Sequence, residues 1–404
     1  MKRQFSIRRS SGRKIMIVGL IISAVLMASI VAILLEHQSI DRNLFDTLPK
    51  QTQMKARPHI TAARSHWLFM GDIFFGRYIN DWSEASSLKE KYPFQNLDQF
   101  ERQHYNAWIA NFECPSVAGL HLSSAATDKT LTFNCDPNYL PEAAKWFTAV
   151  SLGNNHTDNQ GAAGFRSTQE NLTANHIQHF GGYDPRDHAN LCNVITLETT
   201  VTYDSGSDKT LLLPFGFCGY NAVFKIPSDS DLAEITRYSQ LLPTFVMPHM
   251  GTEYQAVPGS LTVATYRRMI DAGAEMVIGN HPHWVQPSES YKDKLIVYSM
   301  GNFIFDQQTP PEKTRSALID VDISVKNPSE VEKWSSIAES CRGNFNACEK
   351  LASDNTLSRL SLAYKFDVKG SNDGNKLVKP ATPSELSAIK DRLKWDQTMG
   401  ALGQ

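Results

Sequence analysis

The sequence predicts an α/β (α+β) fold, because short apolar runs alternate with helix-like segments from Ser65 onward. The segment Tyr266–Ala274 is typical of a helix end, which Gly273 stops just before the apolar run "EMVI". In the same way "PNYLPEAAKWF" precedes "TAVSL", and "GFRSTQENLTANHI" follows the next polar cluster. Strands that alternate with helices indicate a sheet covered by helices.

The bulk composition is that of an ordinary folded protein. The 404 residues are 41% hydrophobic and 20% charged, enough for one large domain or two medium ones. The formal net charge is -2, yet the first fourteen residues are basic without any acid: Lys2, Arg3, Arg8, Arg9, Arg13 and Lys14. Such a tail indicates membrane topology. No basic patch with interleaved aromatic residues occurs elsewhere, so we expect no nucleic-acid partner.

Residues 15–35 form an uncharged apolar run that is long enough to cross a bilayer as a helix. A cleaved signal peptide has a shorter apolar region and a small-x-small cleavage site, whereas Glu36-His37-Gln38 follows here. We therefore expect an uncleaved signal-anchor that crosses the cytoplasmic membrane once. By the positive-inside rule, the basic tail (residues 1–14) stays in the cytoplasm and the main domain lies outside.

The rest of the chain divides into three parts. Residues 36–64 are polar without sustained periodicity, which predicts a stalk or linker. The main domain is expected over residues 65–326. Residues 327–404 form a C-terminal extension, with a strand at "LSRLSLAYKFDV" and a terminal helix opened by Pro383.

The six cysteines indicate disulfides, because no Cys-x-x-Cys occurs and the domain is expected outside the cytoplasm. Cys341 and Cys348, which enclose six residues in "CRGNFNAC", are the expected pair. The pairing of the other four cannot be deduced from the sequence, and buried free thiols are the alternative: Cys114, Cys135, Cys192 and Cys218.

Polar side chains follow six of the apolar runs. The clusters are Gly71-Asp72, Asn111-Phe112-Glu113, 153–158 ("GNNHTD"), 249–254 ("HMGTEY"), 279–283 ("GNHPH") and Gly301-Asn302-Phe303. Ligands of α/β proteins bind at the carboxyl ends of strands, so we expect one site at a single edge of the sheet.

The residue types in these clusters favour metal chemistry. Carboxylate, carboxamide and imidazole groups without cysteine suit divalent Mn, Fe or Zn. Two such ions can polarise a phosphoryl group and activate a water molecule. His156 is the candidate for protonating the leaving oxygen or holding an anionic transition state. The candidate metal ligands are Asp72, Glu113 (which could bridge two ions), Asn155, His249, His281 and His283.

Structural roles compete with these assignments. Asp72 could be a turn former, and Asn155-His156 could cap a helix that begins near Asn159. Asn302 is better explained as a turn residue that holds the last strand. Glu253 and Tyr254 are expected to orient His249. The residues expected to support the ligands or bind substrate are Asn111, Asn154, Glu253, Tyr254 and Asn302.

Other chemistries find less support. There is no Gly-x-Ser-x-Gly elbow, no Walker loop and no Gly-x-Gly-x-x-Gly after a strand. A glycosidase pair of Glu113 and Glu253 would leave the histidines unexplained.

Six motifs in series carry a family resemblance: "GDIFFGR", "NFECP", "LGNNHTDNQG", "HMGTEY", "GNHPHWVQ" and "YSMGNFIFDQ". They resemble the motifs of the CapA family, also called PgsA, of poly-γ-glutamate capsule biosynthesis proteins, which are related to calcineurin-like metallophosphatases. The resemblance covers about Trp67 to Val325. It implies a metallophosphatase-like, four-layer fold in which helices flank a β-sandwich, with the six candidate ligands at one edge and His156 as catalytic histidine.

The chain departs from calcineurin-like phosphatases at two motifs. Phe74 stands where their Gly-Asp-x-His has histidine, and Asn111-Phe112-Glu113 replaces their second Gly-Asp motif. The family often has Trp after the histidine of "HMGTEY", where this chain has Met250.

Two functions follow from this resemblance. The first is a membrane-anchored, metal-dependent hydrolase or transferase that acts on a phosphoester or on the amide of an anionic polymer such as poly-γ-glutamate. The second is a non-catalytic subunit that binds polymer or partner proteins, such as membrane synthase or export subunits. The retained ligand set favours the first function, and the two altered motifs favour the second.

Overall fold

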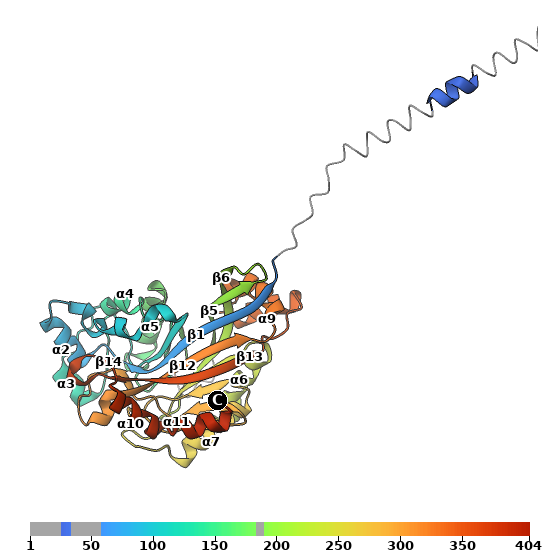
Figure 1. The fold of residues 1–404 in the computed structure, drawn as a ribbon. Coiled ribbons are helices and arrows are strands. Elements are labelled where there is room, and N and C mark those ends of the chain that lie inside the picture. Colours follow the sequence, from blue (N-terminus) through green and yellow to red (C-terminus); the bar gives the residue numbers. More distant parts are fainter. Residues whose placement is uncertain (1–25, 34–57, 183–189) are drawn as a thin grey trace, which may run out of the picture. The chain divides into compact units, whose positions relative to one another are not determined.

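Figure 1 shows the fold in a computed structural model, which describes residues 26–33, 58–182 and 190–404. Residues 58–404 form one compact unit. Of the predicted membrane anchor only residues 26–33 are described, and they are helical; its remainder, the basic tail and most of the predicted stalk lie outside the described residues. Among the described helices, none combines the length and the apolar character that crossing a membrane requires.

A mixed sheet of fourteen strands forms the centre of this unit, which confirms the α/β class. Its main path runs in the order β14 (Lys379–Pro380), β13 (Leu362–Asn372), β12 (Arg315–Val325), β1 (Ile60–Ile73), β5 (Cys192–Tyr203), β6 (Asp208–Asn221), β7 (Thr244–His249), β8 (Met276–Ile278), β10 (Lys294–Val297) and β9 (Ser288–Tyr291). Off this path, β1 also pairs with β11 (Asn302–Ile304) and with β2 (Ala107–Phe112), and β2 continues to β3 (Ala149–Ser151) and β4 (Gln178–Phe180).

Strand β1 is the branch point of the sheet. Its first half pairs antiparallel with β5 and β12, where Arg64 lies opposite Thr200 and Ser324. Its second half pairs in parallel with β2 and β11, where Asp72 lies between Asn111 and Asn302. The strand begins at Ile60, inside the segment predicted to be a stalk. This branching brings the ends of β1, β2 and β11 to one edge.

Side chains of β1 alternate between two hydrophobic clusters. Trp67 points into a core that β1 shares with β6 and β7. Its ring centre lies 4.9 Å from that of Phe215 and 5.0 Å from that of Phe245. Leu68 and Met70 point to the opposite face, under the helices that follow β1 and β2. Both faces of β1 are therefore buried, which explains its nearly continuous apolar run.

The helices lie on the faces and ends of this sheet (Figure 1). They are α2 (Arg77–Ala85), α3 (Ser124–Thr130), α4 (Leu140–Ala143), α5 (Gly161–Ala174), α6 (Asp229–Leu241), α7 (Ser260–Asp271), α8 (Val331–Cys341), α9 (Phe345–Asp354), α10 (Pro383–Leu393) and α11 (Trp395–Leu402). Short 3-10 segments are η1 (Lys89–Phe94), η2 (Leu97–Phe100), η3 (Arg102–His104), η4 (Pro137–Tyr139), η5 (Pro311–Thr314), η6 (Pro328–Glu330) and η7 (Gly374–Lys376).

The C-terminal extension belongs to the same compact unit as the main domain. Strand β13 pairs with β12 along its whole length, from Asn372 opposite Arg315 to Leu362 opposite Val325. The predicted strand and the terminal helix, which begins at Pro383, are confirmed. Helices α8 and α9 occupy the polar segment that the sequence left unassigned.

Three disulfides join the six cysteines. The expected bridge between Cys341 and Cys348 links α8 to α9. The bridges that the sequence left open are Cys114–Cys135 and Cys192–Cys218. Cys192 lies directly opposite Cys218 in the β5–β6 pair, a long hairpin that the strand-and-helix pattern did not predict.

Glycines allow the strand ends to approach one another closely. A Cβ atom added to Gly71 would lie 1.8 Å from the carbonyl oxygen of Gly301, so the ends of β1 and β11 leave no space for a side chain. At Gly279, an added Cβ would lie 2.3 Å from the carbonyl oxygen of Tyr298. The glycines that precede the polar residues of these motifs therefore allow the backbones of neighbouring strand ends to lie close together at this edge.

Gly71→Ala is expected to destabilise the protein by about 1–3 kcal/mol, because backbone rather than a flexible side chain opposes the new methyl group. Gly400→Ala is the matched control. It lies inside α11 with no atom within 4 Å of the added Cβ, and should stabilise the protein by about 0.5–1 kcal/mol. Urea unfolding of the two variants measures both effects, and equal stabilities would contradict the packing argument.

Candidate metal centre

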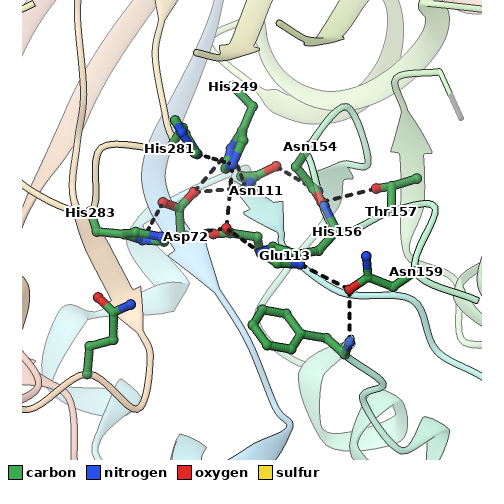
Figure 2. Close-up of polar contacts among 12 residues, drawn as sticks. Asp72, Asn111, Glu113, Asn154, His156, Thr157, Asn159, His249, His281 and His283 are labelled. Carbon is green, nitrogen blue, oxygen red and sulfur yellow. Dashed lines mark hydrogen bonds and ion pairs between the residues drawn. The ribbon is translucent and has the colours of Figure 1, made fainter. Parts of the chain in front are cut away.

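The ends of four strands bring two acids and three histidines together (Figure 2). Asp72 lies near the end of β1, and Glu113 follows β2 directly. His249 ends β7, and His281 and His283 lie in the turn after β8. Both carboxylate residues are 0% exposed, and the three histidines are at most 3% exposed. The single edge that the motifs predicted is therefore a buried cluster.

Two potential ligand groups share one carboxylate. Glu113, His249 and His281 form one group, and Asp72, Glu113 and His283 form the other; within each group the ligand atoms lie within 4.8 Å of one another. Glu113 Oε1 lies 3.5 Å from His249 Nε2 and 3.7 Å from His283 Nε2. The geometry places Glu113 where a carboxylate that bridges two cations would lie.

Three of the four carboxylate oxygens in this cluster lack a hydrogen-bond donor among the described residues. Within the described part of the chain, neither oxygen of Glu113 and only one oxygen of Asp72 has a hydrogen-bond partner. Burial of a charged carboxylate without donors is costly unless a cation neutralises it. Two carboxylates with three imidazoles also suit a borderline divalent metal. The residues present therefore fit one or two metal ions.

The pKa values of the cluster reflect its burial. Burial, reinforced by the negative charge of Asp72, raises the pKa of Glu113 well above its usual range. Burial lowers the pKa of His249 to about 4 and also lowers that of His281. Burial alone would lower the pKa of His283, but Glu113 and Asp72 raise it to about 9. His249 and His281 are thus neutral imidazoles, the form that ligates metals.

Two asparagines form hydrogen bonds beside the candidate ligands. Asn111 Nδ2 donates to Asp72 Oδ1 at 2.8 Å and contacts His249 Nδ1 at 3.2 Å. Asn154 Nδ2 donates to the carbonyl of Phe112 at 2.8 Å and to Asn111 Oδ1 at 3.3 Å. Asn111 therefore contacts two candidate ligands and Asn154 fixes Asn111, whereas their predicted role in supporting a metal site stays a prediction.

His283 has its own supports. Its Nδ1 donates to Asn302 Oδ1 at 2.7 Å, and the ring of Tyr254 stacks on its imidazole with 5.9 Å between the centres. The prediction that Tyr254 orients His249 is therefore wrong, because the tyrosine packs against His283. Glu253 is partly buried, and its negative charge opposes the lowering of the His249 pKa by burial. Its role in orienting His249 stays a prediction.

The turn that carries His281 and His283 is held in an unusual conformation. Their backbone φ values are 99° and 58°, which are positive values that residues other than glycine rarely adopt. Pro282 lies between them, and its carbonyl accepts from the amide of Tyr254 at 2.8 Å. Each residue in such a conformation costs about 1–3 kcal/mol, so surrounding packing must fix the two rings.

His156 approaches the cluster from another side. Its Nδ1 donates to Asn159 Oδ1 at 3.0 Å, and its ring stacks on Phe133 at 4.0 Å. Its Nε2 lies 3.9 Å from Glu113 Oε1, and burial lowers its pKa to about 3. In this state His156 is neutral, with the Nε2 lone pair facing the metal residues.

Asn155 lies in the turn before α5. That helix starts at Gly161 with Gln160 as its N-cap, so the interpretation of Asn155-His156 as a helix cap is wrong. The carboxamide oxygen of Asn155 is buried, and among described residues it has no hydrogen-bond partner. Its role as a metal ligand stays a prediction, whereas the adjacent Asn154 has the contacts described above.

The sequence did not identify three residues near the centre. Asn159 fixes His156 through Oδ1 and also accepts from the Phe133 amide at 2.8 Å. Arg77 donates from Nε and Nη2 to the buried carboxylate of Asp306 at 2.6 and 2.5 Å. All lie inside or beside the quoted motifs, but a single sequence does not reveal that Arg77 and Asp306 meet.

A mixed α/β fold with a buried carboxylate–imidazole cluster defines a candidate metalloprotein, and sequence comparison supplies the family. The family model described as "Bacterial capsule synthesis protein PGA_cap" matches residues 66–207 and 230–307. This is more than half of the chain, so the chain belongs to that family, and the predicted relationship to CapA/PgsA proteins is confirmed.

Three relatives illustrate the relationship. The chain is 27% identical over 247 residues to the capsule biosynthesis protein CapA of Bacillus anthracis, and 28% identical over 252 residues to the PGA biosynthesis protein CapA of Bacillus subtilis (strain 168). Each match covers 59% of this chain, and 59% and 63% of the respective relative. A stretch of 109 residues (25% of this chain, 24% of the relative) is 33% identical to uncharacterized protein y4sH of Sinorhizobium fredii (strain NBRC 101917 / NGR234).

Glu113→Ala is expected to abolish metal binding, because both ligand groups include Glu113. His281→Ala and His283→Ala should each remove about half of the bound metal, because each histidine belongs to one group only. Elemental analysis of chains purified without chelator measures these contents. His179→Ala, a histidine of β4 outside both groups, is the control. A Glu113→Ala variant with full metal content would contradict the shared-ligand geometry.

Proposed function

We propose that this chain is a metal-dependent hydrolase of the phosphoesterase type that acts in capsule biosynthesis. The observation that carries the proposal is Glu113, a fully buried carboxylate that has no hydrogen-bond donor among the described residues and is common to both ligand groups. The names of the Bacillus relatives, capsule biosynthesis protein and PGA biosynthesis protein, support the biological setting.

The residues of the centre divide the work of such a reaction. Asp72, Glu113 and the three histidines would hold the cations. A divalent cation bound there supplies charge that polarises a phosphoryl group and acidifies a water molecule. Asn111 keeps the Asp72 carboxylate in place, and the ring of Phe133 covers one face of the His156 imidazole.

His156 is the residue that can move a proton to the leaving oxygen. Asn159 Oδ1 accepts a hydrogen bond from Nδ1–H, which leaves Nε2 as the atom that can exchange a proton with the substrate. Burial lowers the pKa of His156 to about 3, so the imidazole is neutral near neutral pH. An anionic phosphoryl group beside Nε2 would favour the imidazolium form, which can then protonate the departing alkoxide.

The cellular setting is also part of the proposal. The basic tail and the apolar run of residues 15–35 support a single-pass anchor in the cytoplasmic membrane, with the N-terminus inside and the main domain outside. Poly-γ-glutamate is the proposed polymer, with membrane synthase or export subunits as partners. The two hydrophobic clusters on either face of β1 support the metallophosphatase-like, four-layer arrangement.

A non-catalytic role in polymer binding or scaffolding is the second candidate. The observation that favours it is Phe74, which replaces a histidine of calcineurin-like phosphatases. Its side chain is 0% exposed and packs on Phe133 and Phe305, with ring centres 4.8 and 5.1 Å apart, so this position offers no ligand. A centre with fewer ligands could bind an anionic polymer without hydrolysing it.

His156→Gln tests the catalytic proposal. We expect kcat to fall about 10²–10⁴-fold on a phosphodiester with an alkyl leaving group, and less on a 4-nitrophenyl ester, whose leaving group needs no proton. Metal content should not change, because His156 belongs to neither ligand group. His179→Gln is the control. Two results together would favour the scaffolding role. The metal-loaded wild type would hydrolyse neither phosphodiesters nor poly-γ-glutamate, and cells that carry the Glu113→Ala variant would still produce polymer.

A further inference from the structure

Lys313 lies near the candidate metal centre, with its ammonium group over an aromatic ring. It belongs to η5, is partly buried, and its Nζ lies 3.6 Å from the centre of the Tyr254 ring. Glu253 is near enough to act on this charge. Nevertheless, no carboxylate of the described chain forms an ion pair within 4.0 Å of Lys313 Nζ.

Two contacts tie Lys313 to the His283 side of the centre. The Tyr254 ring, which the Lys313 ammonium group lies over, also stacks on the His283 imidazole at an interplanar angle of 26°. Asn302, which accepts from His283, donates from Nδ2 to the backbone carbonyl of Lys313 at 3.0 Å. Tyr254 and Asn302 therefore place both the metal residue and the lysine.

Two other cations of the described chain, Arg77 and Lys292, are paired with carboxylates. Arg77 also lies near the centre, but Asp306 neutralises it through two hydrogen bonds. Lys292 lies over the ring of Tyr291 at 5.3 Å, and its ammonium group pairs with Asp271. A tyrosine ring attracts a cation by about 0.5–2 kcal/mol but does not neutralise it.

We propose that the Lys313 ammonium group, seated on Tyr254, binds an oxyanion of the substrate next to the metal residues. The ligand chemistry is a carboxylate or a phosphate. The inference rests on the proposed function for the identity of the adjacent centre. Lys313 lies beyond residue 307, where the family match ends.

Isothermal titration calorimetry of the full chain tests this inference with two probes, inorganic phosphate and a γ-linked glutamate pentamer. Wild type, Lys313→Met, Lys313→Arg and Lys292→Met are compared, each with and without prior chelator treatment. Lys313→Met should weaken binding of at least one probe about tenfold, because a charge-assisted hydrogen bond is lost. Lys313→Arg should retain most of the affinity, and Lys292→Met should match wild type.

The two probes separate the sources of the oxyanion. An effect on the pentamer alone assigns the site to polymer carboxylates, and an effect on phosphate alone assigns it to a phosphoester. Equal affinities of Lys313→Met and wild type for both probes would overturn the inference, as would a wild type that binds neither. If a metal-free, inactive wild type still shows the Lys313-dependent difference, the proposed hydrolase fails while the anion site stands.

Discussion

The burial of two carboxylates within reach of each other is the constraint on which the rest of the site depends. Asp72 and Glu113 are removed from water, and only Asp72 receives a hydrogen bond from a neighbouring side chain. In a low-dielectric interior such a pair repels unless positive charge compensates it. Protonated Glu113 and charged His283 are one solution, as their raised pKa values indicate. Bound divalent cations are the other, and they use the same atoms.

The branched sheet brings the two carboxylates and the three histidines together. Because β1 branches, Asp72 has neighbours from both β2 and β11, while parallel β7 and β8 deliver the histidines from the other limb of the sheet. Glycines allow the strand ends to approach, and the left-handed turn around Pro282 directs two imidazoles inward. Remote segments then stabilise the result: β13 extends the sheet beyond β12, and the Cys114–Cys135 bridge closes the loop that carries Phe133.

Much of this was predictable from the sequence, because local patterns encode strand ends. Hydrophobic periodicity, with glycine and proline at the ends of elements, was sufficient to predict the strands that precede the motifs and the helices α5, α7 and α10. It also predicted a polar edge of the sheet that contains Asp72 and Glu113. Contacts between distant segments were not predictable from one chain. Tyr254 packs on His283 rather than His249, and Arg77 meets Asp306, because the branched sheet sets neighbours that sequence spacing does not contain.

Anomalous X-ray diffraction at the absorption edge of the bound metal tests the central claim most directly. Crystals of the chain purified without chelator should show one or two anomalous peaks that contact the Glu113 carboxylate, within reach of His249 and His281 or of Asp72 and His283. No peak in the cluster, or a peak that Glu113 does not contact, would contradict the account of Glu113 as the shared ligand.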